Sequence, residues 1–286
     1  ATALPKAGGA YYFLERALGP AVGTVAGFGT WLSLVLKDAF AMVGMSAYLV
    51  LILDVNATVL ALVLIAMFTL VNVVGSKASA SLQLVLVVVV LGAMAWFIVE
   101  GLAETASRGF DGSNLDPFFT TGVSGIATVV GLVFVSFGGL TKVASAAEEV
   151  EDPSHRIPLG MALSLATATA LYTLGVLVVV ALVPPDVLHG DLAPVHTAAQ
   201  AILPKVGVWL VVVAALAAFS SAVNAGILAA ARYPMAMAPD GLLPARMGTP
   251  RRFATPVVGV VLPGAAISLD ALAFGLESTA HVARPR

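Results

Sequence analysis

Two charged residues, Lys37 and Asp38, stand next to each other in the middle of a long apolar segment, Ala21 to Leu53. Charged groups in a bilayer interior are costly, so they usually face the inside of a helix bundle or a water-filled pathway. Neighbours on a helix point about 100° apart, and each side chain therefore needs a partner on another helix. Two interpretations stay open. Lys37 is a fixed charge or a proton carrier, or the two residues form structural ion pairs between helices.

A second polar group interrupts the apolar segment Val206 to Met237. Ser220, Ser221 and Asn224 lie near its centre, and Ser220 and Asn224 share one helix face because they are four residues apart. Hydroxyl and amide oxygens suit a hard cation or a polar substrate. The same residue types also hold membrane helices together by hydrogen bonds, so a purely structural role is the alternative.

A third group combines glycines with hydroxyls inside the segment Gly122 to Glu149. Its residues are Ser136, Phe137, Gly138, Gly139, Leu140 and Thr141. A glycine pair at this place favours an interrupted helix. The interruption would free carbonyl groups on one side and N–H groups at the new helix start, which suit a carboxylate. Close helix packing against small residues is the alternative, and this is the role expected of Gly23 and Gly27.

Other chemistry finds no support in the residues. There is no cysteine, and the four histidines are not at metal-ligand spacing. The sequence has no phosphate-binding glycine loop, no nucleophile elbow and no basic cluster. We therefore expect no enzyme, no cofactor, no metal ligated by histidine or cysteine, and no nucleic acid partner.

The elements that carry these residues are membrane-spanning helices. The chain has 286 residues, of which 59% are apolar and 10% charged, and its mean hydropathy is +1.01. Soluble domains carry about 25% charged residues, whereas a span needs about 20 apolar residues. Runs such as Leu84 to Leu91 do not alternate, which excludes barrel strands. Seven spans are predicted, at Ala21 to Leu53, Thr58 to Val74, Leu82 to Val99, Gly122 to Glu149, Leu159 to Val183, Val206 to Met237 and Pro256 to Leu276.

The distribution of Lys and Arg predicts the orientation. With the amino end in the cytoplasm, nine fall inside (Lys6, Arg16, Lys77, Lys142, Arg156, Arg232, Arg246, Arg251 and Arg252) and two outside (Arg108 and Lys205). We expect Ala1 to Leu18 to be part of a loop, and His196 to Leu203 to form a short helix in an outer loop. Both ends of the sequence are expected to be incomplete.

Four motifs follow one another along the chain. Pro5-Lys6-Ala7-Gly8-Gly9-Ala10-Tyr11 resembles the Pro-x-x-Gly-Gly-x-Tyr motif of the amino acid-polyamine-organocation superfamily, and Phe137-Gly138-Gly139 resembles its broken sixth span. Glu148 to Pro158 resembles its next cytoplasmic loop, and Arg232 to Pro244 the loop after its eighth span. In the first of these loops, Asp152-Pro153 should turn the chain, Ser154 is available as a cap, and Pro158 can start a helix.

The resemblance implies an all-α polytopic transporter of two inverted five-helix repeats, in which this chain covers about spans three to nine as a single domain, residues 1–286. It implies substrate at the midplane near residues 136–141. It also implies a coupling pathway that includes Lys37, Asp38, Ser220, Ser221 and Asn224, with Na⁺ at Ser220 and Ser221 or with H⁺.

The sequence therefore predicts an integral protein of the cell membrane, surrounded by lipid, that moves amino acids or related amines by secondary transport. Symport with protons or sodium and exchange are all open. A seven-span receptor and a structural membrane subunit are the alternatives, and the Lys and Arg distribution argues against the receptor.

Overall fold

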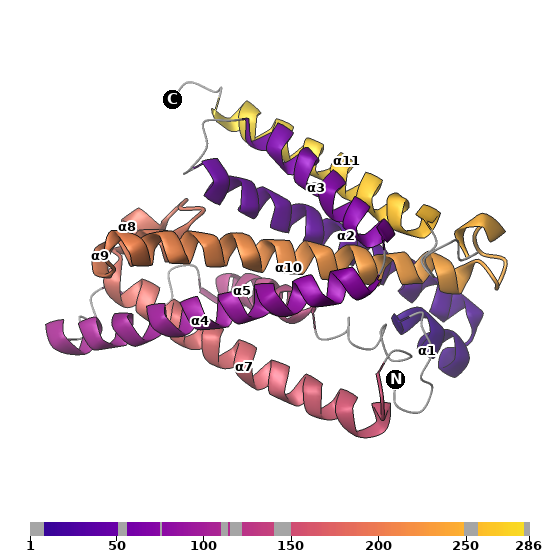
Figure 1. Ribbon diagram of the computed structural model, residues 1–286, viewed down its shortest axis with the longest axis horizontal. Helices are drawn as coiled ribbons and strands as arrows, with labels where there is room; N and C mark the ends of the chain where they lie inside the picture. The colour runs from indigo at the N-terminus through magenta and orange to yellow at the C-terminus, as the bar shows by residue number, and fades with distance from the viewer. Residues whose placement is uncertain are drawn as a thin grey trace. The chain divides into compact units, whose positions relative to one another are not determined.

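The computed structural model describes residues 9–50, 56–74, 76–109, 114, 122–139, 150–248 and 257–282. These residues form helices joined by turns and contain no strand. Figure 1 labels the α-helices: α1 (Gly9–Leu18), α2 (Pro20–Val50), α3 (Ala57–Val74), α4 (Ser76–Arg108), α5 (Gly122–Phe137), α7 (Pro153–Leu182), α8 (Pro185–Leu188), α9 (Pro194–Ile202), α10 (Lys205–Met237) and α11 (Val257–Val282). The 3-10 helix η3 (Ala245–Met247) lies between α10 and α11 in the chain.

Each predicted span overlaps an apolar helix, but the span Gly122 to Glu149 is described only as far as Gly139, and its helix ends at Phe137. Among the described residues, four helices are long and apolar enough to cross a membrane, over Pro20–Leu49, Gln83–Arg108, Pro153–Leu182 and Lys205–Met237. The apolar parts of α3, α5 and α11 are shorter, at Thr58–Val73, Gly122–Phe134 and Val257–Ala273. The predicted all-α polytopic class is confirmed, while the two inverted repeats stay a prediction.

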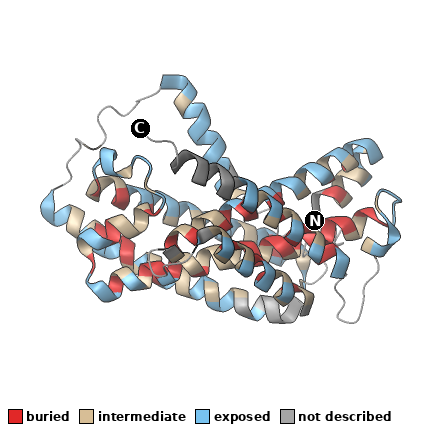
Figure 2. Cartoon of the chain, turned by 90° about the horizontal axis from the view of Figure 1, so that it is seen from above, coloured by how far each residue is buried: buried red, intermediate tan, exposed pale blue. Residues whose placement is uncertain are grey.

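Large apolar side chains are exposed along these helices, and pale blue in Figure 2 marks the exposed residues. On α5, for example, Val123 is 82% exposed and Phe134 is 78% exposed. A single exposed apolar residue is ordinary in a soluble protein, but continuous apolar surfaces mark contact with lipid or with other protein. The exposed residues therefore support lipid or a further part of a membrane protein as the neighbour of this surface.

The chain divides into two compact units, and we describe each by itself. The first comprises Ala1–Val85, Leu140–Met161 and Phe219–Arg286. In this unit α1 packs on α2, and α2, α3 and α11 pack on one another; α3 and α11 lie side by side in Figure 1.

Small residues permit the closest approaches in the first unit. A Cβ atom at Gly23 would clash with the backbone of Glu15, and one at Gly27 would clash with Met237 and Tyr11. The predicted packing role of both glycines is confirmed.

The second unit comprises Leu86–Gly139 and Ala162–Ala218. Its core joins α4, α7, α9 and the first part of α10 through Phe97, Val178, Ala198, Ala199 and Val211, which are all buried. The predicted short helix at His196 to Leu203 is present as α9, which begins two residues earlier, at Pro194, and ends at Ile202.

Two predictions about the loops were wrong. The segment Ala1 to Leu18 was expected to be a loop, but Gly9–Leu18 forms α1. This helix is amphipathic, and it is stabilised by its contact with α2. Its apolar residues are too few to span a membrane, and for that reason the apolar pattern alone did not indicate a helix.

Pro158 was expected to start a helix, but α7 begins at Pro153 and Pro158 lies inside it. Proline is favoured at the first helical position because the N–H group that it lacks has no partner there. The N–H of Arg156 donates to the carbonyl oxygen of Asp152 at 3.1 Å. Ser154 does not cap the helix as expected, since it lies within the first turn and its hydroxyl donates to Asp152 Oδ1 at 2.7 Å.

Candidate functional site

The end of α5 is the centre of the predicted substrate site. The helix stops at Phe137, and Gly138 and Gly139 form a turn. The expected interruption thus coincides with an observed helix end. Leu140 and Thr141, where the helix was expected to resume, lie outside the described residues.

The space around Gly139 argues against a packing role for this residue. A Cβ atom built at Gly139 would meet no described atom within 4 Å. Gly101 on α4 is different, because a Cβ atom there would clash with Val178. Among the glycines of the second unit, Gly101 therefore serves close packing, whereas Gly139 stands at the helix end.

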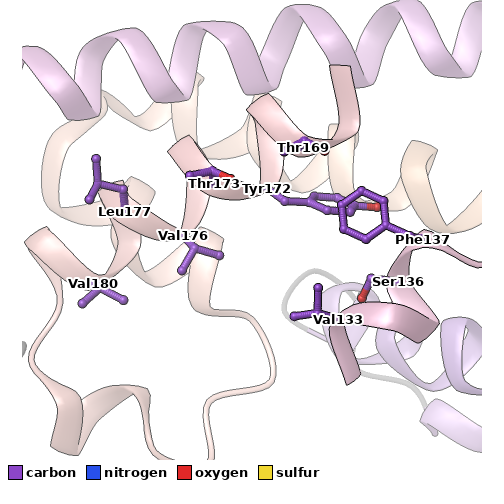
Figure 3. Close-up of a pocket in the computed structure, with 9 residues that line it drawn as sticks. All are labelled: Val133, Ser136, Phe137, Thr169, Tyr172, Thr173, Val176, Leu177 and Val180. Carbon is purple, nitrogen blue, oxygen red and sulfur yellow. The ribbon is translucent and has the colours of Figure 1, made fainter. Parts of the chain in front are cut away.

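A pocket of about 680 Å³ opens beside the end of α5. Figure 3 shows its lining, which comes from α5 and α7: Val133, Ser136, Phe137, Thr169, Tyr172, Thr173, Val176, Leu177 and Val180. The rings of Phe137 and Tyr172 meet edge to face, with their centroids 5.2 Å apart. Two of the predicted substrate residues, Ser136 and Phe137, therefore line a cavity together with α7, and sequence reasoning missed the α7 side.

The electrostatics of this place come from the backbone. The last four carbonyl groups of a helix have no partner within the helix, and this end carries about half a negative charge. The hydroxyl of Ser136 donates to the carbonyl oxygen of Leu132 at 3.1 Å and so stays within the helix. Among the described residues that line the pocket, none is charged. The end of α5 can thus accept hydrogen bonds from an ammonium group, and the pocket beside it suits an uncharged side chain.

The polar residues of the predicted coupling pathway lie in the first unit. Asp38 on α2 is 1% exposed, and Asn224 on α10 is 1% exposed. A Cβ atom at Gly226 would clash with both carboxylate oxygens of Asp38, which shows that this carboxylate lies directly against the backbone of α10. Lys37 is only partly buried, so the two neighbouring charges occupy different environments.

Two buried amides connect α3 with α10. Asn72 Nδ2 donates to Asn224 Oδ1 at 2.9 Å and to the carbonyl oxygen of Phe68 at 2.9 Å. A hydrogen bond between membrane helices contributes about 0.6 kcal/mol on average. Asn72 was missed in the sequence, where it stands in a largely apolar run.

The hydroxyls of Ser220 and Ser221 have different partners. Ser220 Oγ contacts the sulfur of Met45 at 4.0 Å, whereas Ser221 Oγ accepts a hydrogen bond from Gln83 Nε2 on α4. Gln83 Oε1 is buried without a hydrogen bond from the described residues. A thioether is a poor ligand for a hard cation, so the surroundings of Ser220 do not favour Na⁺. The Na⁺ site at these serines stays a prediction, and the described residues contain no cluster of three His, Asp or Glu side chains for another metal.

Two of the sequence motifs meet at one end of the first unit. Tyr11 on α1 is buried, and its hydroxyl donates to Asp240 Oδ2 at 2.6 Å, although 229 positions separate the two residues. Burial, together with the hydrogen bond to the Asp240 carboxylate, raises the pKa of Tyr11 above its ordinary value. The motif that ends in Tyr11 and the motif Arg232 to Pro244, which contains Asp240, thus connect α1 to the loop that follows α10.

Comparison with known proteins agrees with this architecture. The model of the amino acid permease family matches residues 1–276. The chain is 29% identical to the vacuolar cationic amino acid transporter 2 of Arabidopsis thaliana, covering 96% of this chain and 46% of that protein. It is 31% identical to an uncharacterized transporter of Mycobacterium tuberculosis (93% and 60%) and 27% identical to the branched-chain amino acid permease of Lactococcus lactis subsp. cremoris (91% and 60%).

The coverage of the relatives is partial, because the chain spans about half the length of the plant transporter and 60% of the two bacterial proteins. The match to the family model nevertheless extends over nearly the whole chain, from the first motif to α11. Its apolar helices support an integral membrane protein. This chain therefore belongs to the amino acid permease family, within the amino acid-polyamine-organocation superfamily.

Proposed function

We propose that the protein carries amino acids or related amines across a membrane by alternating access. The observation that supports this most is the match of the amino acid permease model to residues 1–276. The three relatives described above are named as transporters or permeases. The relatives' names include a vacuolar and a mitochondrial transporter, so the cell membrane and a cytoplasmic amino end remain proposals based on the Lys and Arg distribution.

The substrate would bind at the end of α5. Its ammonium group would donate hydrogen bonds to the carbonyls freed near Phe137, because this helix end is negative. Its carboxylate would meet N–H groups of the segment that follows Gly139, where Leu140 and Thr141 were predicted to restart a helix. Ser136 and Gly138 are the other residues of the proposed substrate site.

The side chain of the substrate would enter the pocket between α5 and α7. The lining is largely apolar, and its polar groups are the hydroxyls of Ser136, Thr169, Tyr172 and Thr173. A cationic side chain would lose its hydration there without gaining a carboxylate partner. The pocket therefore favours neutral side chains, as in the branched-chain permease, over the cationic ones named for the plant relative.

The driving force is proposed to be a proton or sodium gradient, with exchange as the alternative. Lys37, Asp38, Ser220, Ser221 and Asn224 would form the coupling pathway, because they are the polar residues that interrupt α2 and α10. Intramembrane ionisable residues commonly mark such pathways.

Uptake into liposomes tests the proposal. The protein, expressed from its complete reading frame and reconstituted, should accumulate labelled amino acids from a mixture above the level of protein-free liposomes. Three conditions are compared: an inward proton gradient, an inward sodium gradient, and unlabelled amino acids inside without a gradient. If uptake is absent in all three, the transport proposal is wrong. Uptake only in the third condition would contradict ion coupling and leave exchange.

A further inference from the structure

Asp38 is the carboxylate that the fold encloses most completely. It is 1% exposed, and among the charged side chains of the described residues only Asp38 and Arg232 are buried. Its two carboxylate oxygens lie against the α10 backbone at Gly226, at a place where any side chain would collide with them. Gly226 is therefore the residue that makes room for this carboxylate.

The first unit also holds polar side chains on α10, α3 and α4. Asn224 precedes Gly226 by two residues on α10 and accepts a hydrogen bond from Asn72 on α3. One turn earlier on α10, Ser221 accepts from Gln83 on α4. A core that serves only apolar packing has no need of five polar side chains, because each must find hydrogen-bond partners once it is removed from water. The five are Asp38, Asn72, Gln83, Ser221 and Asn224.

We propose that Asp38 is a proton-binding site that takes up and releases one proton in each transport cycle. The proposal rests on the transport function proposed above. A proton from the water on one side adds to a carboxylate oxygen and gives a neutral carboxyl group, and the same proton later leaves to the water on the other side. The bound proton removes a negative charge from the apolar interior, where a charge is costly.

The geometry favours a proton over a metal ion. Na⁺ and other hard cations need several oxygen ligands around them. The Asp38 carboxylate is in contact with the helix backbone at Gly226, which occupies the space that such a shell of ligands requires. A proton needs only one oxygen atom.

Asp38 is more deeply buried than the other described acidic side chains on α2 and on the helices packed around it. The described charged side chains on α2 and on the helices packed around it are Lys37, the ion pair of Glu15 and Arg16 on α1, Arg232 and the exposed Lys205 at the start of α10, and Asp270 on α11; α3 has none. Lys37 precedes Asp38 directly, and Arg232 lies six positions beyond Gly226. Glu15 and Asp270 are more exposed than Asp38, so water can stabilise their charges.

Infrared difference spectroscopy tests the proposal without any substrate. The purified protein in lipid, expressed from its complete reading frame and labelled with ¹³C-aspartate, is titrated across the pH range in which it remains folded. We expect a C=O stretching band of a protonated aspartic acid that appears on acidification and shifts with the label. A label-sensitive band that never titrates, or no such band at all, would overturn the proposal even if no variant folds.

Three variants assign the band. Asp38→Asn keeps the volume of the side chain and should remove the band, whereas the matched control Asp186→Asn, at an exposed position on α8, should leave it unchanged. Gly226→Ala should shift its titration midpoint, because the new methyl group displaces the carboxylate. A titrating band that persists in Asp38→Asn would refute the assignment.

Transport by Asp38→Asn gives the second readout. Uptake driven by a proton gradient should fall to the level measured without a gradient, while exchange of labelled for unlabelled amino acid continues. Gradient-driven uptake that survives the substitution would sink the proposal, as would loss of both activities in a folded variant. If the Asp38 band titrates but the protein transports nothing, the proposed transport function is wrong while Asp38 is still a proton-binding site.

Discussion

Replacing Gly139 by leucine tests whether the end of α5 is a binding element. Gly139 stands two residues after the last helical residue, Phe137, and a Cβ atom there would meet no described atom within 4 Å. The described residues therefore leave room for the first atom of a side chain. Gly131 offers a matched control, because it lies inside α5 and a Cβ atom at this position also meets nothing within 4 Å.

The expected loss of affinity follows from two effects. Leucine favours a helix over glycine by about 1 kcal/mol, so Gly139→Leu promotes continuation of α5 through the turn. Continuation pairs the carbonyls that would otherwise accept hydrogen bonds from the substrate ammonium group. A hydrogen bond to a charged group contributes about 1.5–3 kcal/mol, so losing one weakens binding about tenfold to hundredfold. Gly131→Leu has the same helix preference in an existing helix and should bind normally.

The assay measures substrate binding per folded molecule, with the folded fraction determined by size-exclusion chromatography and thermal unfolding. The substrate is the amino acid that the uptake mixture identifies. Gly139→Leu should unfold at the wild-type temperature and bind about tenfold or more weakly. Near-normal affinity in Gly139→Leu would refute the binding role of this helix end. An equal loss in Gly131→Leu would also refute it, because the effect would then not depend on the break.

Three further predictions follow from the pocket, the topology and the motif contact. Tyr172→Ala removes one ring of the pocket lining and should weaken uptake of large neutral amino acids more than that of alanine, which competition assays can measure; equal effects on both would contradict the side-chain pocket. Single cysteines at Ser113 and Ser154 should be labelled from opposite sides, with Ser113 outside, since the chain has no cysteine of its own; labelling from one side would end the topology. Tyr11→Phe removes the hydrogen bond to Asp240 and should lower the free energy of unfolding by about 1 kcal/mol at neutral pH. Because the pKa of Tyr11 is raised in the folded state, the contribution of Tyr11 to the free energy of unfolding should decline as pH rises above about 10. Urea titrations at alkaline pH measure this as the difference in free energy of unfolding between the wild type and Tyr11→Phe, and a difference that stays constant would contradict the raised pKa.

The membrane helices could be predicted because length and apolar composition determine them locally. A run such as Val206 to Met237 can satisfy its backbone in lipid only as a helix, and α10 (Lys205–Met237) matches it within one residue. The end of α5 at Phe137 was also predictable, since two adjacent glycines with flanking hydroxyls disfavour a continuous helix. The start of α7 was not, because proline at either position 153 or 158 is compatible with a first turn, and only the structure shows which one begins the helix.

Pairings between distant helices could not be predicted. The roles of Asn72 and Gln83 depend on Asn224 and Ser221, more than 130 positions away. Tyr11 and Asp240 were each assigned to a motif, but no feature of either motif names the other. A single sequence does not show which helices touch. The structure distinguishes Asp38, which is buried against Gly226, from Lys37, which is only partly buried.

Glycine at four positions shows why the contacts decide between packing and binding. At Gly27 and Gly101 a Cβ atom would meet apolar side chains of another helix, and at Gly226 it would meet a carboxylate. At Gly139 it would meet no described atom within 4 Å. In the first two cases glycine increases apolar contact, and larger residues should lower stability. In the third, glycine admits a polar group that apolar packing would exclude. Open space alone does not make Gly139 a candidate, because Gly131 inside α5 also meets no described atom. Its position in the turn that follows the end of α5 does, since the carbonyl groups of a helix end have no partner within the helix.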